Sequence, residues 1–176
     1  ITGCASKDSK KIDFSRTSEV ELYQSAQTQL KRGNFETAIE KLQLMEKRYP
    51  FGEYSKSAQL SLIYAYYGFQ EPESANASAD RFIRLHPQHS NIDYAYYMKG
   101  LIAFPIAKTI VQRFFDVDLS KRDINQSKIS FNYFAELTER FPDSEYTPDA
   151  LKRQEFLRNL LARHEIHIAN QYMERK

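Results

Sequence analysis

The sequence predicts an all-α protein made of stacked, antiparallel helix pairs. Three prolines, Pro50, Pro87 and Pro142, head similar segments, and each is followed by an alanine eight positions later. A small residue stands twelve positions before each proline. No segment shows the alternation of apolar and polar residues that is typical of a strand. Repetition of this kind indicates a repeat architecture rather than a single closed core.

The spacing within each repeat has a physical meaning. Small residues at Ala38, Ala75 and Ser130 allow two antiparallel helices to approach closely. The proline ends the second helix of each pair, because it cannot continue the hydrogen-bond ladder. Large apolar residues lie between these positions: Leu42 and Met45, Phe82, Phe134 and Leu137. This is the pattern of the tetratricopeptide repeat (TPR), whose nominal period is about 34 residues.

The expected elements follow in order along the chain. Residues 1–18 are interpreted as a lipobox remnant and a flexible tether, and residues 19–176 as a TPR solenoid. Its pairs lie near 19–50, 51–87 and 88–142, with further helices over 148–176. The helices themselves are expected near 19–32, 35–48, 55–69, 73–85, 91–104, 123–140, 148–162 and 164–175. Gly33 supplies the turn inside the first pair. The expected caps are Ser55, Asn91, Asp123, and Thr147 with Pro148 at the first helical position.

Two departures from the regular period are informative. Pro87 and Pro142 are 55 positions apart, so an insertion is expected at about 105–122, within the third pair. Apolar residues in so long a connection usually indicate a packed or functional loop. At the other end, the last helix has no partner and no polar cap, which predicts a truncated sequence.

The amino-terminal residues suggest a lipid anchor. Cys4 is the one cysteine of the chain, which excludes an internal disulfide and a cysteine-based metal site. The run Ile1-Thr2-Gly3-Cys4 is the pattern that the lipoprotein signal peptidase reads before acylation of the cysteine. The alternative is a free thiol in a flexible terminus. A tether behind an anchor would hold a domain near a membrane without inserting it.

Composition and motifs exclude several functions. A mean hydropathy of −0.64 and the lack of a long apolar run exclude a spanning helix in the sequence. A net charge of +2 does not favour nucleic acid as a partner. The sequence has no nucleophile elbow, P-loop or dinucleotide-binding glycine motif. His164 and His167 do not form a zinc-protease motif. We therefore expect no enzyme activity, no cofactor and no metal.

Tyrosines gather on the expected first helices of the second and third pairs. They are Tyr64, Tyr66, Tyr67, Tyr94, Tyr96 and Tyr97. Adjacent helical residues diverge by about 100°, so part of this set must face the groove or solvent. Tyrosine offers an apolar face and a polar tip, which suits extended peptides. The alternative for any one tyrosine is packing between repeats.

Several stretches together resemble the BamD family, the TPR lipoproteins of the outer-membrane β-barrel assembly machinery (BAM complex). The stretches are Ile1–Cys4, Tyr49–Gly52, Leu62–Tyr67, Asp80–Leu85, Asn91–Tyr94, Gly100–Leu101, Phe114–Asp118 and Arg122–Asp123. The resemblance implies an outer-membrane scaffold, lipid-anchored at Cys4 and facing the periplasm. Its implied partners are the POTRA domains of BamA, companion lipoproteins and unfolded outer-membrane protein precursors. The protein would contact the membrane only through its lipid.

The resemblance also implies a pocket for extended segments. Carried onto this sequence, its residues are Tyr49, Phe51, Tyr54, Tyr64, Tyr67, Arg81, Asp93 and Tyr97. Two other functions stay open. One is a periplasmic TPR lipoprotein that coordinates peptidoglycan synthesis or envelope constriction. The other is a cytosolic chaperone adaptor, which would need a carboxylate clamp that Lys31, Arg32 and Lys99 do not obviously make.

Overall fold

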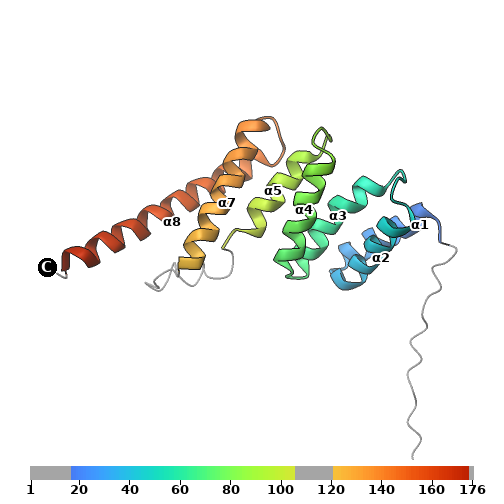
Figure 1. The fold of residues 1–176 in the computed structure, drawn as a ribbon, viewed down its shortest axis with the longest axis horizontal. Coiled ribbons are helices and arrows are strands. Elements are labelled where there is room, and N and C mark those ends of the chain that lie inside the picture. Colours follow the sequence, from blue (N-terminus) through green and yellow to red (C-terminus); the bar gives the residue numbers. More distant parts are fainter. Residues whose placement is uncertain (1–16, 106–120, 175–176) are drawn as a thin grey trace, which may run out of the picture.

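The computed structural model describes residues 17–105 and 121–174, and every regular element in these ranges is a helix. The predicted all-α class is confirmed. The helices are α1 (Glu19–Lys31), α2 (Phe35–Arg48), α3 (Ser55–Gly68), α4 (Pro72–Leu85), α5 (Ile92–Ile102), α7 (Lys121–Arg140) and α8 (Thr147–Glu174). Figure 1 shows them stacked in chain order along the longest axis of the molecule.

Each helix packs mainly on its neighbours in the chain. α1 packs on α2, α2 on α3, α3 on α4, α4 on α5, α5 on α7 and α7 on α8. The core is accordingly divided into three clusters of buried apolar residues, which lie among α1–α3, α3–α5, and α5, α7 and α8. Such a chain has no single centre, because each pair buries its apolar face against the next.

The repeated small residues lie where the helices approach most closely. Ala38, Ala75 and Ser130 are fully buried, as are the alanines that follow the prolines. The Ser130 hydroxyl donates a hydrogen bond to the Gly100 carbonyl at 2.8 Å, which joins α7 to α5. A Cβ atom added to Gly100 would overlap the ring of Phe134. The third pair is therefore held together by a glycine, a serine and a large aromatic ring.

The turns follow the sequence signals. Gly33 has a φ of 73° between α1 and α2, a conformation that favours glycine. Its N–H donates to the Leu30 carbonyl at 3.0 Å. Pro50, Pro87 and Pro142 each stand two positions beyond the end of α2, α4 and α7, respectively.

The predicted caps are mostly wrong. Ser55 is the first residue of α3, and its hydroxyl donates to the Pro50 carbonyl at 2.8 Å. Asn91 precedes α5 but its side chain makes no capping hydrogen bond. Thr147 begins α8 and donates to the Phe141 carbonyl at 2.8 Å, so Pro148 is the second helical residue. Asp123 falls inside α7. The Ser55 and Thr147 hydroxyls thus bond to carbonyls of the preceding turn rather than to the helix N–H groups.

One amino-terminal cap was not predicted. The Ser18 hydroxyl accepts a hydrogen bond from the Glu21 N–H at 3.3 Å, and the Glu21 carboxylate accepts from the Ser18 N–H at 3.0 Å. This reciprocal capping box fixes the start of α1.

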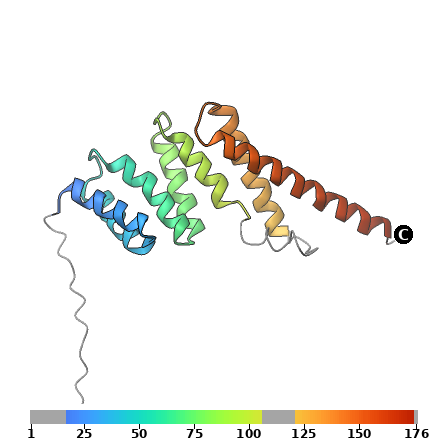
Figure 2. The ribbon, with the colours of Figure 1, turned by 180° about the vertical axis from the view of Figure 1, so that it is seen from behind.

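The two helices expected at 148–162 and 164–175 are one helix, α8. No glycine or proline follows Pro148, so nothing in the sequence breaks the hydrogen-bond ladder. Figures 1 and 2 both show the second half of α8 running on past α7. There Ile166, Tyr172 and Met173 are 60%, 71% and 67% exposed.

Several expectations lie outside the described residues. They concern Cys4, the tether as far as residue 16, and positions 106–120 of the expected insertion. Among the helices that are described, none is both long enough and apolar enough to cross a membrane.

Candidate functional site

The first helices of successive pairs line a pocket of about 450 Å³. We call their shared surface the first-helix face; it is formed by α1, α3, α5 and the turn that leads into α8. The lining residues are Tyr23, Gln27, Leu30, Lys31, Ser57, Leu60, Ser61, Tyr64, His89, Asn91, Tyr94 and Tyr146. A third of this lining is tyrosine, so the pocket offers both apolar ring faces and hydroxyl groups.

Ring contacts hold the tyrosines of this face in place. The Tyr23 ring lies 5.0 Å from that of Tyr54, and the Tyr94 ring 5.6 Å from that of Tyr146, centroid to centroid. Tyr64 meets Phe35 edge-on at 5.9 Å and remains 41% exposed. Burial raises the pKa of the Tyr94 hydroxyl above its ordinary value, so it stays protonated and can donate. The pocket wall is thus built from aromatic side chains in fixed positions.

Polar groups complete the pocket. Gln27 donates a hydrogen bond from Nε2 to the Ser61 hydroxyl at 2.7 Å, which joins α1 to α3. His89 accepts the Asn91 N–H at Nδ1 over 3.1 Å. Burial, together with the nearby charge of Lys56, lowers the pKa of His89, so its ring is neutral at neutral pH. A neutral His89 keeps Nε2 as a donor.

A polar network lies beside the pocket, where α5 meets α8. The Tyr97 hydroxyl donates to Asp149 Oδ2 at 2.6 Å, and Arg153 Nε donates to the same oxygen at 2.5 Å. Burial alone would raise the pKa of Asp149, but these two hydrogen bonds and the charge of Arg153 hold it below its ordinary value. Burial and the bond to Asp149 raise the pKa of Tyr97 to about 12. The network therefore fixes α8 against α5 in a defined register.

The predicted pocket residues are only partly brought together. Tyr64 lines the pocket, and Tyr54 supports it by packing on Tyr23. Tyr97 stacks on Tyr146 with centroids 4.8 Å apart. Tyr67 is half-buried in the cluster among α3–α5. Asp93 accepts a hydrogen bond from the Ser144 hydroxyl at 2.6 Å, so it fixes the turn before α8.

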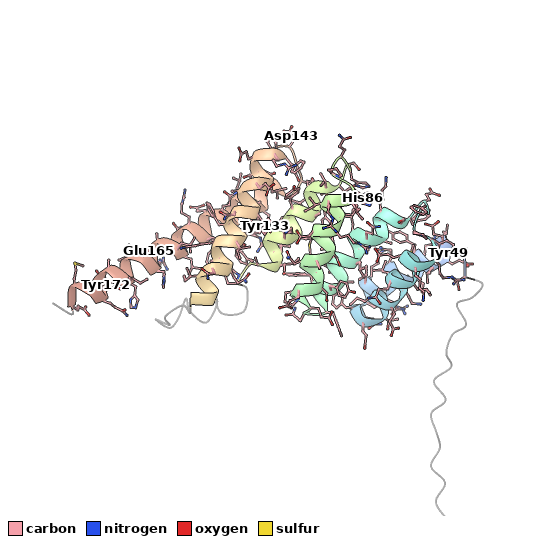
Figure 3. All side chains as sticks on the ribbon, viewed as in Figure 1. Tyr49, His86, Tyr133, Asp143, Glu165 and Tyr172 are labelled. Carbon is pink, nitrogen blue, oxygen red and sulfur yellow. The ribbon has the colours of Figure 1, made fainter. Side chains whose placement is uncertain are left out.

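Tyr49 and Phe51 lie at the amino-terminal end of the solenoid and do not line the pocket. Figure 3 labels Tyr49 at that end, far from Tyr172 on α8. The Tyr49 hydroxyl donates to the Thr17 carbonyl at 2.9 Å, which ties the entry of the chain to the end of α2. Phe51 is 99% exposed in the turn after Pro50.

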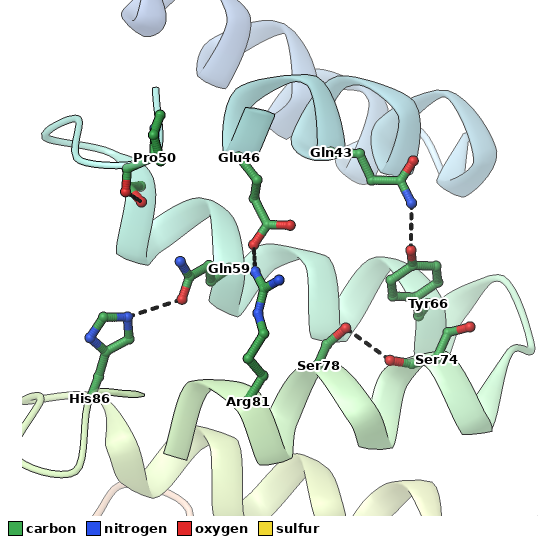
Figure 4. Close-up of polar contacts among 10 residues, drawn as sticks. Gln43, Glu46, Pro50, Gln59, Tyr66, Ser74, Ser78, Arg81 and His86 are labelled. Atoms are coloured by element: carbon green, nitrogen blue, oxygen red, sulfur yellow. Dashed lines mark hydrogen bonds and ion pairs between the residues drawn. The ribbon is translucent and has the colours of Figure 1, made fainter. Parts of the chain in front are cut away.

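Arg81 does not line the pocket. It extends from α4, a second helix, and forms an ion pair with Glu46 of α2. Figure 4 shows this pair between two other links, Gln43–Tyr66 and Gln59–His86. Arg81 is absent from the pocket because it belongs to a second helix, and second helices turn their polar faces away from the surface that the first helices share.

The predicted pocket set contained only Tyr64 of the twelve described lining residues, and four of those it lacked shape the pocket. Tyr23, Gln27 and Lys31 recur at four-residue intervals on α1, the spacing of a single helix face. That periodicity was present in the sequence and could have identified them. Tyr146 precedes α8, and only the stacking of the third pair on the second brings it to the pocket. Among the described residues, no group of three or more His, Cys, Asp or Glu side chains could hold a metal ion.

Comparison with known proteins identifies the family of this chain. The family model of YfiO, described as an outer membrane lipoprotein, matches residues 15–176. The chain belongs to this family. This chain is therefore associated with the outer membrane, as the family description states.

Curated relatives in the family share one name, outer membrane protein assembly factor BamD. The protein of Vibrio cholerae is 40% identical over 156 residues, which cover 89% of this chain and 65% of the relative. That of Neisseria meningitidis serogroup B is 35% identical over 178 residues, covering 99% and 67%. That of Pasteurella multocida is 36% identical over 175 residues, covering 99% and 66%. The chain thus spans about two thirds of the length of these relatives.

Proposed function

We propose that this chain is a non-catalytic scaffold of outer-membrane protein assembly, which holds extended peptide segments in the pocket of its first-helix face. The observation that carries the proposal is the tyrosine-lined pocket in a member of a family whose relatives are named as assembly factors. Those names do not favour the alternative role in peptidoglycan synthesis or envelope constriction.

The chemistry of the pocket suits an extended segment. The hydroxyls of Tyr23, Tyr64 and Tyr94 have no hydrogen-bond partner among residues 17–105 and 121–174, so they are available to a ligand. Ring faces would cover alternate side chains of a segment, and the hydroxyls would bond to its backbone. Both an unfolded outer-membrane protein precursor and a companion lipoprotein of the BAM complex would supply an extended segment of this kind.

Anchoring and docking complete the proposal. Cys4 accepts the lipid, and the tether of residues 5–16 leaves the solenoid free to face the periplasm. The acyl chains confine the solenoid to one membrane surface, which raises the effective concentration of its partners. The POTRA domains of BamA are the docking partner, and a bound precursor is passed to them. No cofactor takes part.

The pocket assignment is tested by two tyrosines of one helix. Tyr64 lines the pocket, whereas the hydroxyl of Tyr66 accepts a hydrogen bond from Gln43 on the opposite side. Tyr64→Ala should weaken binding of a labelled, unfolded precursor segment about tenfold, because a large ring face is lost. Tyr66→Ala serves as the matched control and should leave the affinity unchanged. Equal affinities for wild type and Tyr64→Ala, with unchanged helicity by circular dichroism, would remove the pocket from the proposal.

Anchoring and partners are tested together in the native envelope. The intact mass of the full-length protein should show a triacyl increment at Cys4, and BamA should co-purify with it. An acylated protein accompanied by cell-wall enzymes would leave the anchor and move the function to the alternative. An unmodified thiol would contradict the anchor itself.

A further inference from the structure

Lys31 is the only lysine, arginine, aspartate or glutamate among the described residues that line the pocket, and it differs from two charged residues nearby. Arg153 is paired with Asp149. Asp93 accepts hydrogen bonds from the Ser144 hydroxyl and the Tyr94 N–H. Lys31, in contrast, is exposed in the last turn of α1 and has no ion pair or hydrogen bond among the described residues. Its ammonium group is therefore available to a ligand.

None of the described residues that line the pocket is an aspartate or a glutamate, although the charges of Glu145 and Asp93 act on the lining residue Tyr146. The one histidine among the described lining residues, His89, is neutral, because burial and the nearby charge of Lys56 lower its pKa. Lys56 acts on His86 in the same direction, so a positive potential reaches the His89 end of the pocket as well. A ligand in the pocket would meet the Lys31 ammonium and several hydrogen-bond donors.

We propose that Lys31 makes this pocket selective for an extended peptide segment that carries an aspartate or glutamate side chain next to an aromatic or aliphatic residue. The carboxylate pairs with the Lys31 ammonium, and the neighbouring apolar side chain packs against the rings of Tyr23 and Tyr64. This inference rests on the proposed function, in which the pocket binds extended segments, and adds the chemistry by which it chooses among them.

Charge complementarity favours a peptide over other anions. A single lysine matches a single carboxylate, whereas nucleic acid or a charged lipid surface is bound by arrays of cationic side chains. The hydroxyls of Ser57 and Ser61 line the same pocket and can bond to a peptide backbone. The four tyrosines provide the apolar contact area that a peptide side chain needs.

The test uses short fluorescent peptides blocked at both ends, so that the internal side chain is the one carboxylate. Three versions of the peptide carry aspartate, asparagine or lysine, respectively, at one position beside a phenylalanine. Binding to the full-length protein is measured by fluorescence anisotropy at low and physiological salt. The wild type should bind the aspartate peptide about three- to fivefold more tightly than the asparagine peptide, and salt should reduce this preference.

Charge variants assign the preference to one residue. Lys31→Gln should remove the aspartate preference and leave binding of the asparagine peptide unchanged. Lys31→Glu should reverse the preference, so that the lysine peptide binds more tightly than the aspartate peptide. Lys47→Gln is the matched control: it makes the same change of net charge at an exposed position on α2, outside the pocket, and should keep the wild-type preference.

The outcomes separate this inference from the proposed function. Equal binding of the aspartate and asparagine peptides to wild type would overturn the role of Lys31 and leave the pocket as a peptide site. Tighter binding of a peptide with a free carboxyl terminus and no acidic side chain would overturn it as well, because the terminus would then be the recognised anion. Failure of every peptide to bind would overturn the proposed function.

Discussion

Replacing Gly100 by alanine should destabilise the protein, because α5 and α7 approach one another at this residue. Gly100 is buried within α5, and its carbonyl accepts the Ser130 hydroxyl at 2.8 Å. The Phe134 ring of α7 fills the space where an alanine Cβ would stand. Phe134 is fully buried, with the rings of Tyr97 and Phe104 at 6.0 and 6.2 Å, so it has little room to move.

Two opposing effects set the size of the change. Alanine is favoured over glycine inside a helix by about 1 kcal/mol. Forcing a methyl group into a well-packed core costs about 1–3 kcal/mol, and the enclosed ring places this case near the upper figure. The net expectation is a free energy of unfolding lower by about 2 kcal/mol.

Urea unfolding followed by far-ultraviolet circular dichroism measures this change. A second background, Phe134→Leu, provides the control, because the smaller side chain leaves room for the methyl group. In that background Gly100→Ala should cost less than about 0.5 kcal/mol, so the two substitutions should be strongly coupled. A higher urea midpoint for Gly100→Ala in the wild-type background would refute the packing argument, since the helix propensity of alanine alone would then determine the change in stability.

Four further predictions concern the ends and links of the helices. Ser18→Ala removes the capping box of α1 and should lower the free energy of unfolding by about 1 kcal/mol, with faster amide exchange in the first turn of α1. Because hydrogen bonds hold the pKa of Asp149 below its ordinary value, wild type should lose stability as the pH falls below about 4, and Asp149→Asn should lose less over that range in urea titrations. Tyr97 keeps its proton to about pH 12, so stability should fall from about pH 10 upward, and Tyr97→Phe should reduce that fall. The ammonium of Lys99 is buried, but its partner Asp80 is half-exposed and the Tyr133 ring also contacts the ammonium, so Asp80→Asn should destabilise by about 1 kcal/mol, whereas Lys99→Met should change the urea midpoint little.

The helices could be predicted from the sequence because the signals for them are local. Prolines end α2, α4 and α7, and small residues at fixed distances from them are buried as expected. The break expected inside α8 was wrong, since a change in the apolar pattern near Arg163 does not interrupt a helix without glycine or proline. The caps were less predictable, because a serine or threonine can bond equally to the preceding turn.

The site was less predictable than the fold, because it is assembled from three helix pairs. Of the predicted pocket residues, Tyr64 is the one that lies in the pocket lining. Arg81 was assigned to the pocket, although its place on a second helix already argued against the shared face. Tyr146 comes from a distant turn, and no local pattern marks it as a neighbour of Tyr94.

The chain-neighbour packing of the helices has a consequence for how the protein is made. α1 and α2 bury their apolar faces against each other, and α3 then closes over them, before any residue of α7 is required. Contacts that are close in sequence form quickly and cost little loop entropy. The amino-terminal pairs can therefore reach their native packing while the carboxyl-terminal half is still being synthesised or translocated. Folding in this order exposes one unfinished helix face at a time, which limits the apolar surface open to aggregation at any moment.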